Sequence, residues 1–349
     1  MINIEDFLKK YFKDNDKIIL ACSTWPDSMF LLYKILKTNY KKNLVVCYFN
    51  HKTRPETDLE EKFILELWEK EWFKVEIANC DFEKIKKLYP SKSFEELARE
   101  KRYQFFDAIL NIYKANYIIT AHHLDDKIET FLFNMMRWSK LSWLINMTEC
   151  SGSPYTLEQT SPPTPLLKGE ESKYKSSPSP WGERARGWGK ILRPLLNLEK
   201  SNILSYLEKN NLKYFIDQTN SDTDITRNYL RHEIVPKFEK INKSYKSNIS
   251  NLLNYFEDIK ENIDKEVLEF LWDNDYFIIN EFNKKSNLLQ KEIIRQIYFV
   301  SNWNSTIWLS ESNIAEILKF INWKNNKTIK EIKKLNMKKD WKKIFFKFD

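Results

Sequence analysis

Glycine is nearly absent from this sequence of 349 residues. It occurs 5 times, whereas average usage of about 7% would give roughly 24 in a chain of this length. All five glycines lie between residues 152 and 189, so the rest of the chain contains none. A globular domain without glycine lacks its usual means of adopting positive φ at turns and helix ends. Tryptophan, normally among the scarcest residues, occurs 12 times.

Paired cysteines and long apolar runs are also missing. The 4 cysteines are scattered and form no C-x-x-C pair, which argues against a zinc site, an iron–sulfur cluster or a redox couple. We expect free thiols in a reducing compartment. No apolar run has the length of a membrane span, and the first residues lack the basic-then-apolar pattern of a signal peptide. The sequence therefore predicts a cytoplasmic protein.

The residues that are present suffice for a sizeable core. Hydrophobic residues make up 42% of the chain and aromatic residues 15%, enough for one large domain or two smaller ones. The formal net charge is +8, from 57 Lys and Arg against 49 Asp and Glu. This mild basic excess suits a polyanionic partner such as nucleic acid without requiring one.

Short apolar runs alternate with longer segments of helical spacing in the first 121 residues. The runs are too short for helices and lack strict polar alternation, which is typical of buried parallel strands. A serine followed three residues later by glutamate, at Ser93 and Glu96, predicts a capping box at the start of one helix. We expect strands at 17–22, 44–49, 73–78 and 117–121 and helices at 29–36, 59–71 and 93–113. The order predicts an α/β fold with a doubly wound parallel sheet.

Composition divides the chain into two domains and an insertion. Residues 148–190 hold six of the 11 prolines and all five glycines, a composition that predicts an exposed, disordered insertion. We expect it to interrupt a first domain over 1–235. A smaller, mainly helical second domain follows over 236–349, with helical stretches at 249–259, 288–300 and 314–321.

Two polar segments follow expected strands. Residues 23–28 (STWPDS) join the first strand to a helix and place hydroxyls, a carboxylate and free amides at a helix N-terminus, where anions bind. An ordinary N-cap is the alternative. The second segment holds His122, His123, Asp125 and Asp126, with Glu129 on the next helix. Such a cluster could hold a metal ion, act as acid or base, or bind an ammonium group, and a solvated cap is the alternative.

These segments resemble the N-type ATP pyrophosphatase, or PP-loop, family, whose S-G-G-x-D-S motif follows the first strand. Within it, the closest resemblance is to the tRNA(Ile)-lysidine synthetases. Further matches occur in order along the chain: NHKTRPE at 50–56, FEELAREKRY at 94–103, AHHLDDKIET at 121–130, RWS at 137–139, LRPL at 192–195, DQTN at 217–220 and RNYLRHE at 227–233.

The resemblance implies a ligase that modifies the wobble cytidine of tRNA(Ile) with a CAU anticodon. ATP, with Mg²⁺, would first adenylate the base at its C2 oxygen. Free L-lysine would then attack C2 through its ε-amine, releasing AMP and leaving lysidine. The alternatives are a tRNA thiolase on the same core, which the absence of paired cysteines disfavours, and a catalytically inactive tRNA-binding relative.

The resemblance also implies roles for individual residues. ATP binding falls to Ser23, Thr24, Trp25, Pro26, Asp27, Ser28, Asn50 and His51, with Asp27 also the expected Mg²⁺ ligand. The expected catalytic residues are Asp27, His122, His123, Asp126 and Glu129, of which Asp126 and Glu129 would bind the lysine substrate. Contacts to AMP or tRNA would come from Arg99, Arg102, Arg137, Arg193, Arg227, Asn228 and Arg231, and the second domain would bind tRNA.

Several positions depart from the family pattern because they carry bulky residues where the family has glycine. Thr24 and Trp25 replace the two glycines of the phosphate loop, and Trp138 and Trp143 replace glycines of a later segment. Trp72, Trp308 and Trp323 also occupy expected turns. We hypothesise that many tryptophans are glycines in the native protein, encoded by UGA codons that mean glycine in the source. A genuine Trp25 would favour the inactive relative.

Overall fold

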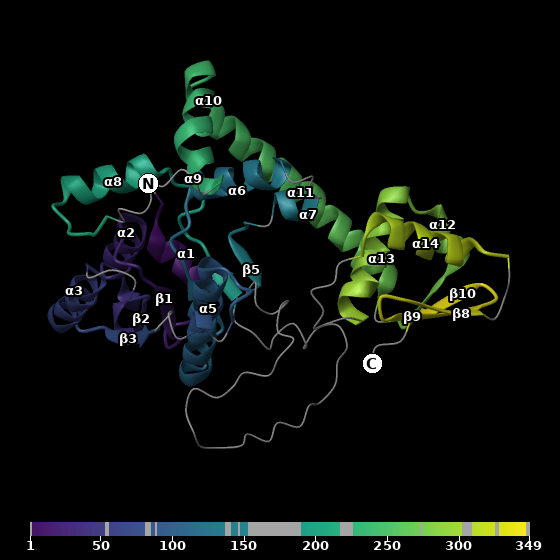
Figure 1. Ribbon diagram of the computed structural model, residues 1–349, viewed down its shortest axis with the longest axis horizontal. Coiled ribbons are helices and arrows are strands. Elements are labelled where there is room, and N and C mark those ends of the chain that lie inside the picture. The colour runs from purple at the N-terminus through teal and green to yellow at the C-terminus, as the bar shows by residue number, and fades with distance from the viewer. Residues whose placement is uncertain are drawn as a thin grey trace. The chain divides into compact units, whose positions relative to one another are not determined.

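The computed structural model describes residues 2–52, 56–80, 85–87, 89–136, 141–145, 147–152, 190–216, 226–272, 274–301, 309–324 and 328–346 (Figure 1). These residues form two compact units. The first contains residues up to 152 and from 190 to 255, and the second begins at Phe256. Among all the residues described above, no helix is long and apolar enough to cross a membrane.

A six-stranded sheet organises the first unit. Its strands are β1 (Ile18–Ala21), β2 (Leu44–Asn50), β3 (Lys74–Asn79), β4 (Tyr117–Ile119), β5 (Cys150–Gly152) and β6 (Lys190–Leu192), in the order β3-β2-β1-β4-β6-β5. All neighbouring pairs are parallel except β5 with β6. The expected doubly wound α/β fold and its four strands are therefore confirmed.

The helices of the first unit precede, connect and follow these strands. They are α1 (Ile4–Tyr11), α2 (Pro26–Ile35), α3 (Glu56–Glu71), α5 (Phe94–Tyr113), α6 (Leu124–Met136), α7 (Leu141–Leu144), α8 (Lys200–Lys209), α9 (Thr226–Tyr229), α10 (Val235–Ile241) and the start of α11 (Tyr245–Leu271). The capping box expected at α5 is confirmed, because Ser93 Oγ accepts from the amide of Glu96 and the Glu96 carboxylate accepts from the amide of Ser93.

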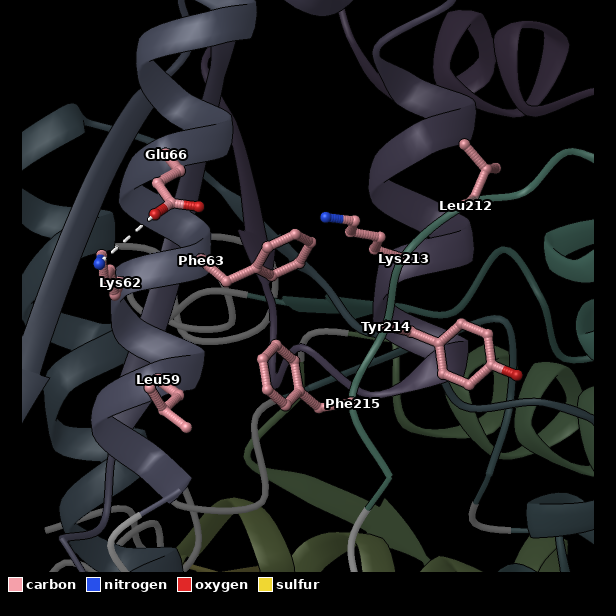
Figure 2. Close-up of a pocket in the computed structure, with 8 residues that line it drawn as sticks. All are labelled: Leu59, Lys62, Phe63, Glu66, Leu212, Lys213, Tyr214 and Phe215. Carbon is pink, nitrogen blue, oxygen red and sulfur yellow. Dashed lines mark ion pairs between the residues drawn. The ribbon is translucent and has the colours of Figure 1, made fainter.

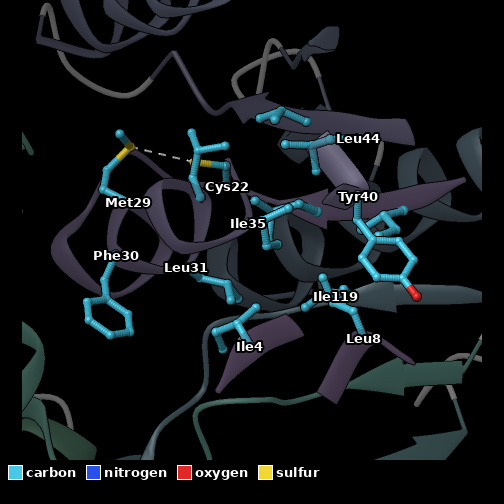
Figure 3. Packing of buried hydrophobic residues seen from close by; sticks show 14 of the residues in the cluster. Ile4, Leu8, Cys22, Met29, Phe30, Leu31, Ile35, Tyr40, Leu44 and Ile119 are labelled. Atoms are coloured by element: carbon cyan, nitrogen blue, oxygen red, sulfur yellow. Dashed lines mark hydrogen bonds between the residues drawn. The ribbon is translucent and has the colours of Figure 1, made fainter. Parts of the chain in front are cut away.

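The core of this unit packs α1 and α2 against the central strands (Figure 3). Leu8 of α1, Leu31 and Ile35 of α2, and Ile119 of β4 are fully or almost fully buried. Both β1 and β2 are buried along nearly their whole length, as apolar runs without polar alternation require. This packing fixes the carboxyl ends of β1 and β4 next to each other on one edge of the sheet.

The expected insertion at 148–190 begins and ends in the sheet. Residues 153–189 lie outside the described part of the chain, but β5 and β6 flank them and pair antiparallel, with Gly152 opposite Lys190. The chain therefore leaves the sheet and returns to it at neighbouring positions. The sequence missed β5 because three residues at the edge of a proline- and glycine-rich segment give no strand pattern.

The second unit combines helices with an antiparallel sheet. After α11 come α12 (Ile279–Lys284), α13 (Asn287–Ser301) and α14 (Glu311–Asn322), and the strands are β7 (Tyr276–Ile278), β8 (Thr328–Ile332), β9 (Leu335–Asp340) and β10 (Lys343–Phe346), in the order β7-β10-β9-β8. The expected helices are present, but the sequence missed the sheet. Lysine, which is unfavourable in strands, obscured the alternation, and Lys339 is buried with its ammonium on the backbone carbonyls of Ile321 and Trp323.

Three tryptophans adopt the left-handed backbone conformation that favours glycine. Trp72 and Trp272 have φ of 56° and 23° and directly follow α3 and α11, the position where glycine most often ends a helix. Trp341 has φ of 52° and is the first residue of the two-residue loop between β9 and β10, where the favoured turn requires glycine. Their side chains are 86%, 75% and 65% exposed, so burial does not compensate for the backbone cost.

The other tryptophans at expected glycine positions behave differently. Trp25 and Trp323 have φ of −77° and −66°, so neither position requires glycine for its backbone angle. In the phosphate loop it is Thr24 that adopts positive φ, at 65°. Trp143 lies in the short helix α7, and Trp138 and Trp308 lie outside the described residues.

Candidate active site

Hydrogen bonds from Ser28 and from the backbone of Phe215 fix the conformation of the loop between β1 and α2. Ser28 Oγ accepts from the amide of Ser23 at 3.1 Å and donates to the carbonyl of Trp25 at 3.0 Å. The carbonyl of Thr24 accepts from the amide of Phe215 at 3.0 Å. No side chain caps the N-terminus of α2, so its first-turn amides remain available to an anion. The N-cap alternative for this loop is therefore wrong.

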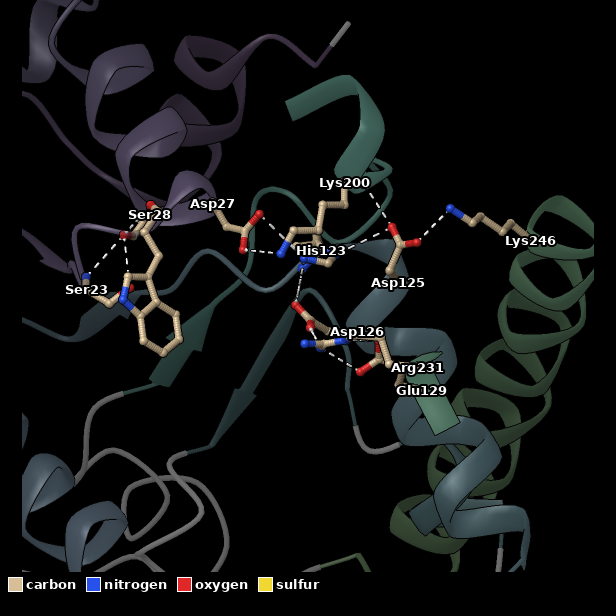
Figure 4. Close-up of polar contacts among 11 residues, drawn as sticks. Ser23, Asp27, Ser28, His123, Asp125, Asp126, Glu129, Lys200, Arg231 and Lys246 are labelled. Carbon is tan, nitrogen blue, oxygen red and sulfur yellow. Dashed lines mark hydrogen bonds and ion pairs between the residues drawn. The ribbon is translucent and has the colours of Figure 1, made fainter. Parts of the chain in front are cut away.

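His123 lies among three carboxylates at the end of β4 (Figure 4). Its Nε2 is 3.6 Å from Asp27 Oδ1 and 3.4 Å from Asp126 Oδ2, and its Nδ1 is 3.6 Å from Asp125 Oδ2. The side chain is 2% exposed. Burial disfavours the charged ring, but Asp27 and Asp126 raise the pKa of His123 above its ordinary value. The His123 ring thus lies between the start of α2 and the start of α6.

His122 differs from its neighbour. Its Nδ1 lies 2.8 Å from Thr120 Oγ1, and burial lowers the pKa of His122 to about 4. Its ring is therefore neutral at pH 7, whereas His123 is stabilised in the charged form. Adjacent histidines thus have pKa values that shift in opposite directions.

Two lysines that sequence reasoning missed complete the cluster. Lys200 Nζ is 3.3 Å from Asp27 Oδ2, and Lys246 Nζ is 2.6 Å from Asp125 Oδ1. Burial favours the neutral form of Asp27, but His123 and Lys200 hold the pKa of Asp27 below its usual value. Lys200 carried one usable signal, because it begins the helix that follows a parallel strand. Lys246 lies on α11, and no sequence pattern pointed to it.

Glu129 and Arg231 form a bidentate ion pair. Arg231 Nε and Nη2 donate to the two carboxylate oxygens of Glu129 at 2.7 and 2.8 Å, and Nη2 is 3.5 Å from Asp126 Oδ1. Burial raises the pKa of Glu129 although Arg231 opposes the shift. The sequence assigned Glu129 to an ammonium ligand and Arg231 to RNA or AMP, whereas the structure joins them to each other.

Other expected contact residues support the fold. Arg193 is buried, and its Nη1 donates to the carbonyl of Thr148 at 2.9 Å and to Ser151 Oγ at 2.8 Å, which holds the β5 edge. Asn50 is fully buried and its Nδ2 donates to Glu61 at 2.6 Å.

The remaining expected contacts are distributed over the first unit. The guanidiniums of Arg99 and Arg102 lie 5.6 and 5.9 Å from the ring centroid of Tyr103. The ring of His51 lies edge-on to Phe49 at 4.9 Å, and Asn228 is buried. Arg227 lies in α9. Arg137 and residues 217–220 fall outside the described residues.

Asp27 fits the expected Mg²⁺ ligand. Its Oδ1 is buried and accepts no hydrogen bond from the described residues. Mg²⁺ in nucleotide sites is commonly held by one or two carboxylates together with substrate phosphates. No cluster of three His, Cys, Asp or Glu side chains in the described ranges forms an all-protein metal site, so the remaining ligands would be phosphate and water.

A separate hollow of about 530 Å³ lies between α3 and residues 212–215 (Figure 2). The rings of Phe63 and Phe215 meet there edge to face, with centroids 5.6 Å apart. The charged residues that line it are Lys62, Glu66 and Lys213. Among the described residues, none of those expected to bind ATP, lysine or tRNA lines this hollow, and we place the candidate site at the strand ends.

A family model for the PP-loop domain matches residues 1–238. The tRNA(Ile)-lysidine synthase of Mycoplasma mycoides subsp. mycoides SC is 30% identical over 94% of this chain and 73% of its own length. The tRNA(Ile)-lysidine synthase of Staphylococcus aureus is 27% identical over 81% of this chain. The bifunctional protein TilS/HprT of Listeria innocua is 25% identical over 99% of it. The chain spans 57% and 50% of those two relatives.

A solved structure also shares the fold. The U34-tRNA thiolase NcsA from Methanococcus maripaludis, solved with its [4Fe-4S] cluster, superposes with a TM-score of 0.51 at 16% identity, covering 72% of this chain and 75% of the thiolase. At this identity the likeness concerns the fold alone.

Proposed function

This chain belongs to the tRNA(Ile)-lysidine synthase family of PP-loop ligases, and from that premise we propose that it converts the wobble cytidine of tRNA(Ile) with a CAU anticodon to lysidine, using ATP and free L-lysine. The observation that carries the proposal is the convergence of two loops at one sheet edge. Asp27 in the first turn of α2, which follows β1, and Asp126 in the first turn of α6, which follows β4, both contact His123. Ligands bind at this edge of open parallel sheets.

The first step is adenylation of the base. The ATP phosphates bind the free amides at the start of α2, with Ser23 and Ser28 alongside, and Asp27 would hold Mg²⁺ that offsets phosphate charge. The cytidine C2 oxygen attacks the α-phosphorus and pyrophosphate leaves. The charged ring of His123 keeps Asp27 oriented toward the phosphates while this negative charge shifts.

The second step needs a site for the whole amino acid. Free lysine carries a carboxylate as well as two amino groups, so its site requires both a cation and an anion. Asp126 and Arg231 lie 3.5 Å apart at the site, and Glu129 fixes the guanidinium. We assign Asp126 to an amino group of the substrate and Arg231 to its carboxylate. The ε-amine then attacks C2 and displaces AMP.

The thiolase alternative is disfavoured by the cysteines as well as by the relatives. Cys22 and Cys47 are buried, and burial raises the pKa of Cys22 to about 11. A buried neutral thiol is a poor sulfur carrier because the thiolate is the reactive form.

We assign tRNA binding by the second unit to the outer face of its sheet. Residues 328–346 contain seven lysines and two acidic residues, and by strand register Lys338 and Lys343 lie on this face together with Glu331 and Asp340. Across neighbouring strands Tyr276 pairs with Phe345, and Phe345 with Lys338. The two rings lie 5.4 Å apart, and Lys343 Nζ is 3.9 Å from the Tyr276 ring centroid. Aromatic rings interleaved with lysines suit single-stranded RNA, whose bases stack while its phosphates pair with ammonium groups.

The test is ATP-dependent incorporation of labelled lysine into tRNA(Ile) transcripts with CAU or GAU anticodons. We expect incorporation with the CAU transcript alone and its loss in Asp27→Asn. The chain as written and a Trp25→Gly variant are tested in parallel. Activity restored by Trp25→Gly would identify Trp25 as the defect, and no incorporation by either form would contradict the lysidine proposal.

A further inference from the structure

Lys200 occupies a fixed position beside the phosphate loop. It is the first residue of α8, and its backbone amide donates to Asp125 Oδ2 at 2.9 Å. That bond anchors the main chain of Lys200 at the strand-end edge. From there the side chain reaches Asp27, with Nζ 3.3 Å from Oδ2 (Figure 4). The Lys200 side chain therefore links α8 to the start of α2, where Asp27 lies 173 positions earlier in the sequence.

Lys246, the second lysine of the cluster, differs from Lys200 in its number of acidic partners. Lys246 Nζ contacts two carboxylates, Asp125 at 2.6 Å and Glu199 at 3.2 Å. Asp125 then has one oxygen on Lys246 and the other on the amide of Lys200. The ammonium of Lys200 is left with Asp27 as its acidic partner among the described residues.

The contact between Lys200 and Asp27 has features that allow a phosphate to replace Asp27 as the partner of the ammonium. At 3.3 Å it is longer than a strong charge-assisted hydrogen bond, and the Lys200 side chain is 37% exposed. The other carboxylate oxygen of Asp27 lies 3.6 Å from His123 Nε2. Loss of Lys200 from Asp27 would therefore leave that carboxylate with a second polar neighbour. A polyphosphate carries more negative charge than one carboxylate and competes for the ammonium.

We propose that Lys200 is a pyrophosphate-binding residue: it pairs with Asp27 in the empty site and transfers to the β- and γ-phosphates when ATP binds. This inference rests on the proposed use of ATP and extends it to a residue outside the motifs. After adenylation, the same ammonium stabilises the leaving pyrophosphate. A phosphate-binding lysine acts as a flexible point charge on a long stem, and the fixed main chain of Lys200 supplies the base for that movement.

The experiment compares Lys200→Gln, Lys200→Arg and a matched control, Lys209→Gln, in the full chain. Lys209 is an exposed lysine in the last turn of the same helix. Pyrophosphate and ATP affinities are measured calorimetrically with Mg²⁺ and without tRNA, and KM values for ATP and lysine come from incorporation assays. We expect Lys200→Gln to weaken pyrophosphate binding about 10- to 100-fold, as loss of one charge-assisted hydrogen bond does.

The controls separate this role from a structural one. Lys200→Arg should keep most of the affinity because the charge remains, and Lys209→Gln should bind as the unmodified chain does. The KM for ATP should rise in Lys200→Gln while the KM for lysine stays within about twofold. Unchanged pyrophosphate affinity in a folded Lys200→Gln protein would overturn the inference, as would a rise in the KM for lysine alone. If the unmodified chain binds pyrophosphate through Lys200 but incorporates no lysine, the proposed function fails while this inference stands.

Discussion

The two units treat polar side chains in opposite ways. In the first unit, the buried polar or charged residues are Thr24, Ser28, Asn43, Asn50, Thr57, Glu60, Thr120, His123, Lys127, Glu129, Arg193 and Asn228. In the described part of the second unit, Lys339 is the one such residue, and it serves the end of α14. A buried charge is costly unless it is paired and hydrogen-bonded. In the first unit the buried charged residues include His123 and Glu129 of the candidate site, whereas the described part of the second unit keeps its other charged side chains at least partly exposed.

The largest effect is expected from removing the ring at the centre of the buried cluster. His123→Ala leaves Asp27, Asp125 and Asp126 without the imidazole between them. We expect lysine incorporation to fall by about 100-fold or more, because the ring positions the carboxylates of Asp27 and Asp126 and a misplaced reacting group can cost about 100-fold in rate. Initial rates measure the loss, and circular dichroism checks folding. Full activity would show that the buried charge of the first unit has no catalytic purpose.

The next effect separates two roles for Arg231. Arg231→Gln removes the bidentate partner of Glu129 and, on our assignment, the ligand of the substrate carboxylate. The KM for lysine should rise about 10- to 100-fold while the KM for tRNA stays the same. Arg231→Lys should lie between, since it keeps the charge but loses the fork. A change confined to the KM for tRNA would instead support the role expected from the sequence.

A smaller effect should occur equally in both units, because turn geometry does not depend on their roles. Trp72→Gly in the first unit and Trp341→Gly in the second relieve a left-handed backbone angle. We expect each to raise the free energy of unfolding by about 1 kcal/mol in urea titrations. Trp323→Gly is the control, since Trp323 is also exposed but has φ of −66°. Stabilisation by the control, or none at either test position, would contradict the backbone explanation.

The same positions bear on the origin of the tryptophans. If UGA codons encode glycine in the source, the codons for Trp72, Trp272 and Trp341 should be UGA, because these residues occupy glycine geometry. The codons for positions 25, 138 and 143 test the hypothesis as drawn from the sequence. UGG at all of these positions would end it.

A modest effect is expected on the surface of the second unit. Lys338→Gln removes one ammonium from the outer face of the sheet, where Lys338 pairs with Phe345 across the strands. We expect tRNA affinity to fall about threefold and the slope of log affinity against log salt to flatten by about one, with kcat unchanged. Fluorescence anisotropy of labelled tRNA at several salt concentrations measures both. Lys284→Gln on α12 is the control, and an equal loss there would place the RNA elsewhere.

The smallest effect is expected from removing residues 153–189, which lie between β5 and β6 in the sequence. Gly152 and Lys190 are paired neighbours in β5 and β6, so an Asn-Gly turn can replace residues 153–189. Lysine incorporation by the shortened chain should stay within about threefold of the full chain. A complete loss of incorporation by a folded shortened chain would assign the interrupting residues a part in the reaction.

Local sequence patterns predicted β1 to β4 of the first unit and the capping box at Ser93, because burial and capping act over a few residues. They missed the sheet of the second unit, where Lys330, Lys338 and Lys339 stand in strands. They placed both Thr24 and Trp25 at glycine positions of the family and did not show that the positive φ of the loop lies at Thr24. Such an angle depends on how the loop joins its neighbours, here through the hydrogen bond from Phe215 to Thr24.

The sequence by itself determined the α/β class, the family and the edge of the sheet where the site lies, because strand periodicity and ordered motifs are properties of the linear chain. Only the tertiary structure decided which charges meet there. Lys200 joins Asp27 across 173 positions, and Arg231 joins Glu129 across 102. Each side chain on its own fits several roles. Its role is decided by the partner that folding brings within hydrogen-bonding distance, because the energy of a charged group depends on its nearest neighbours and on its exposure to water.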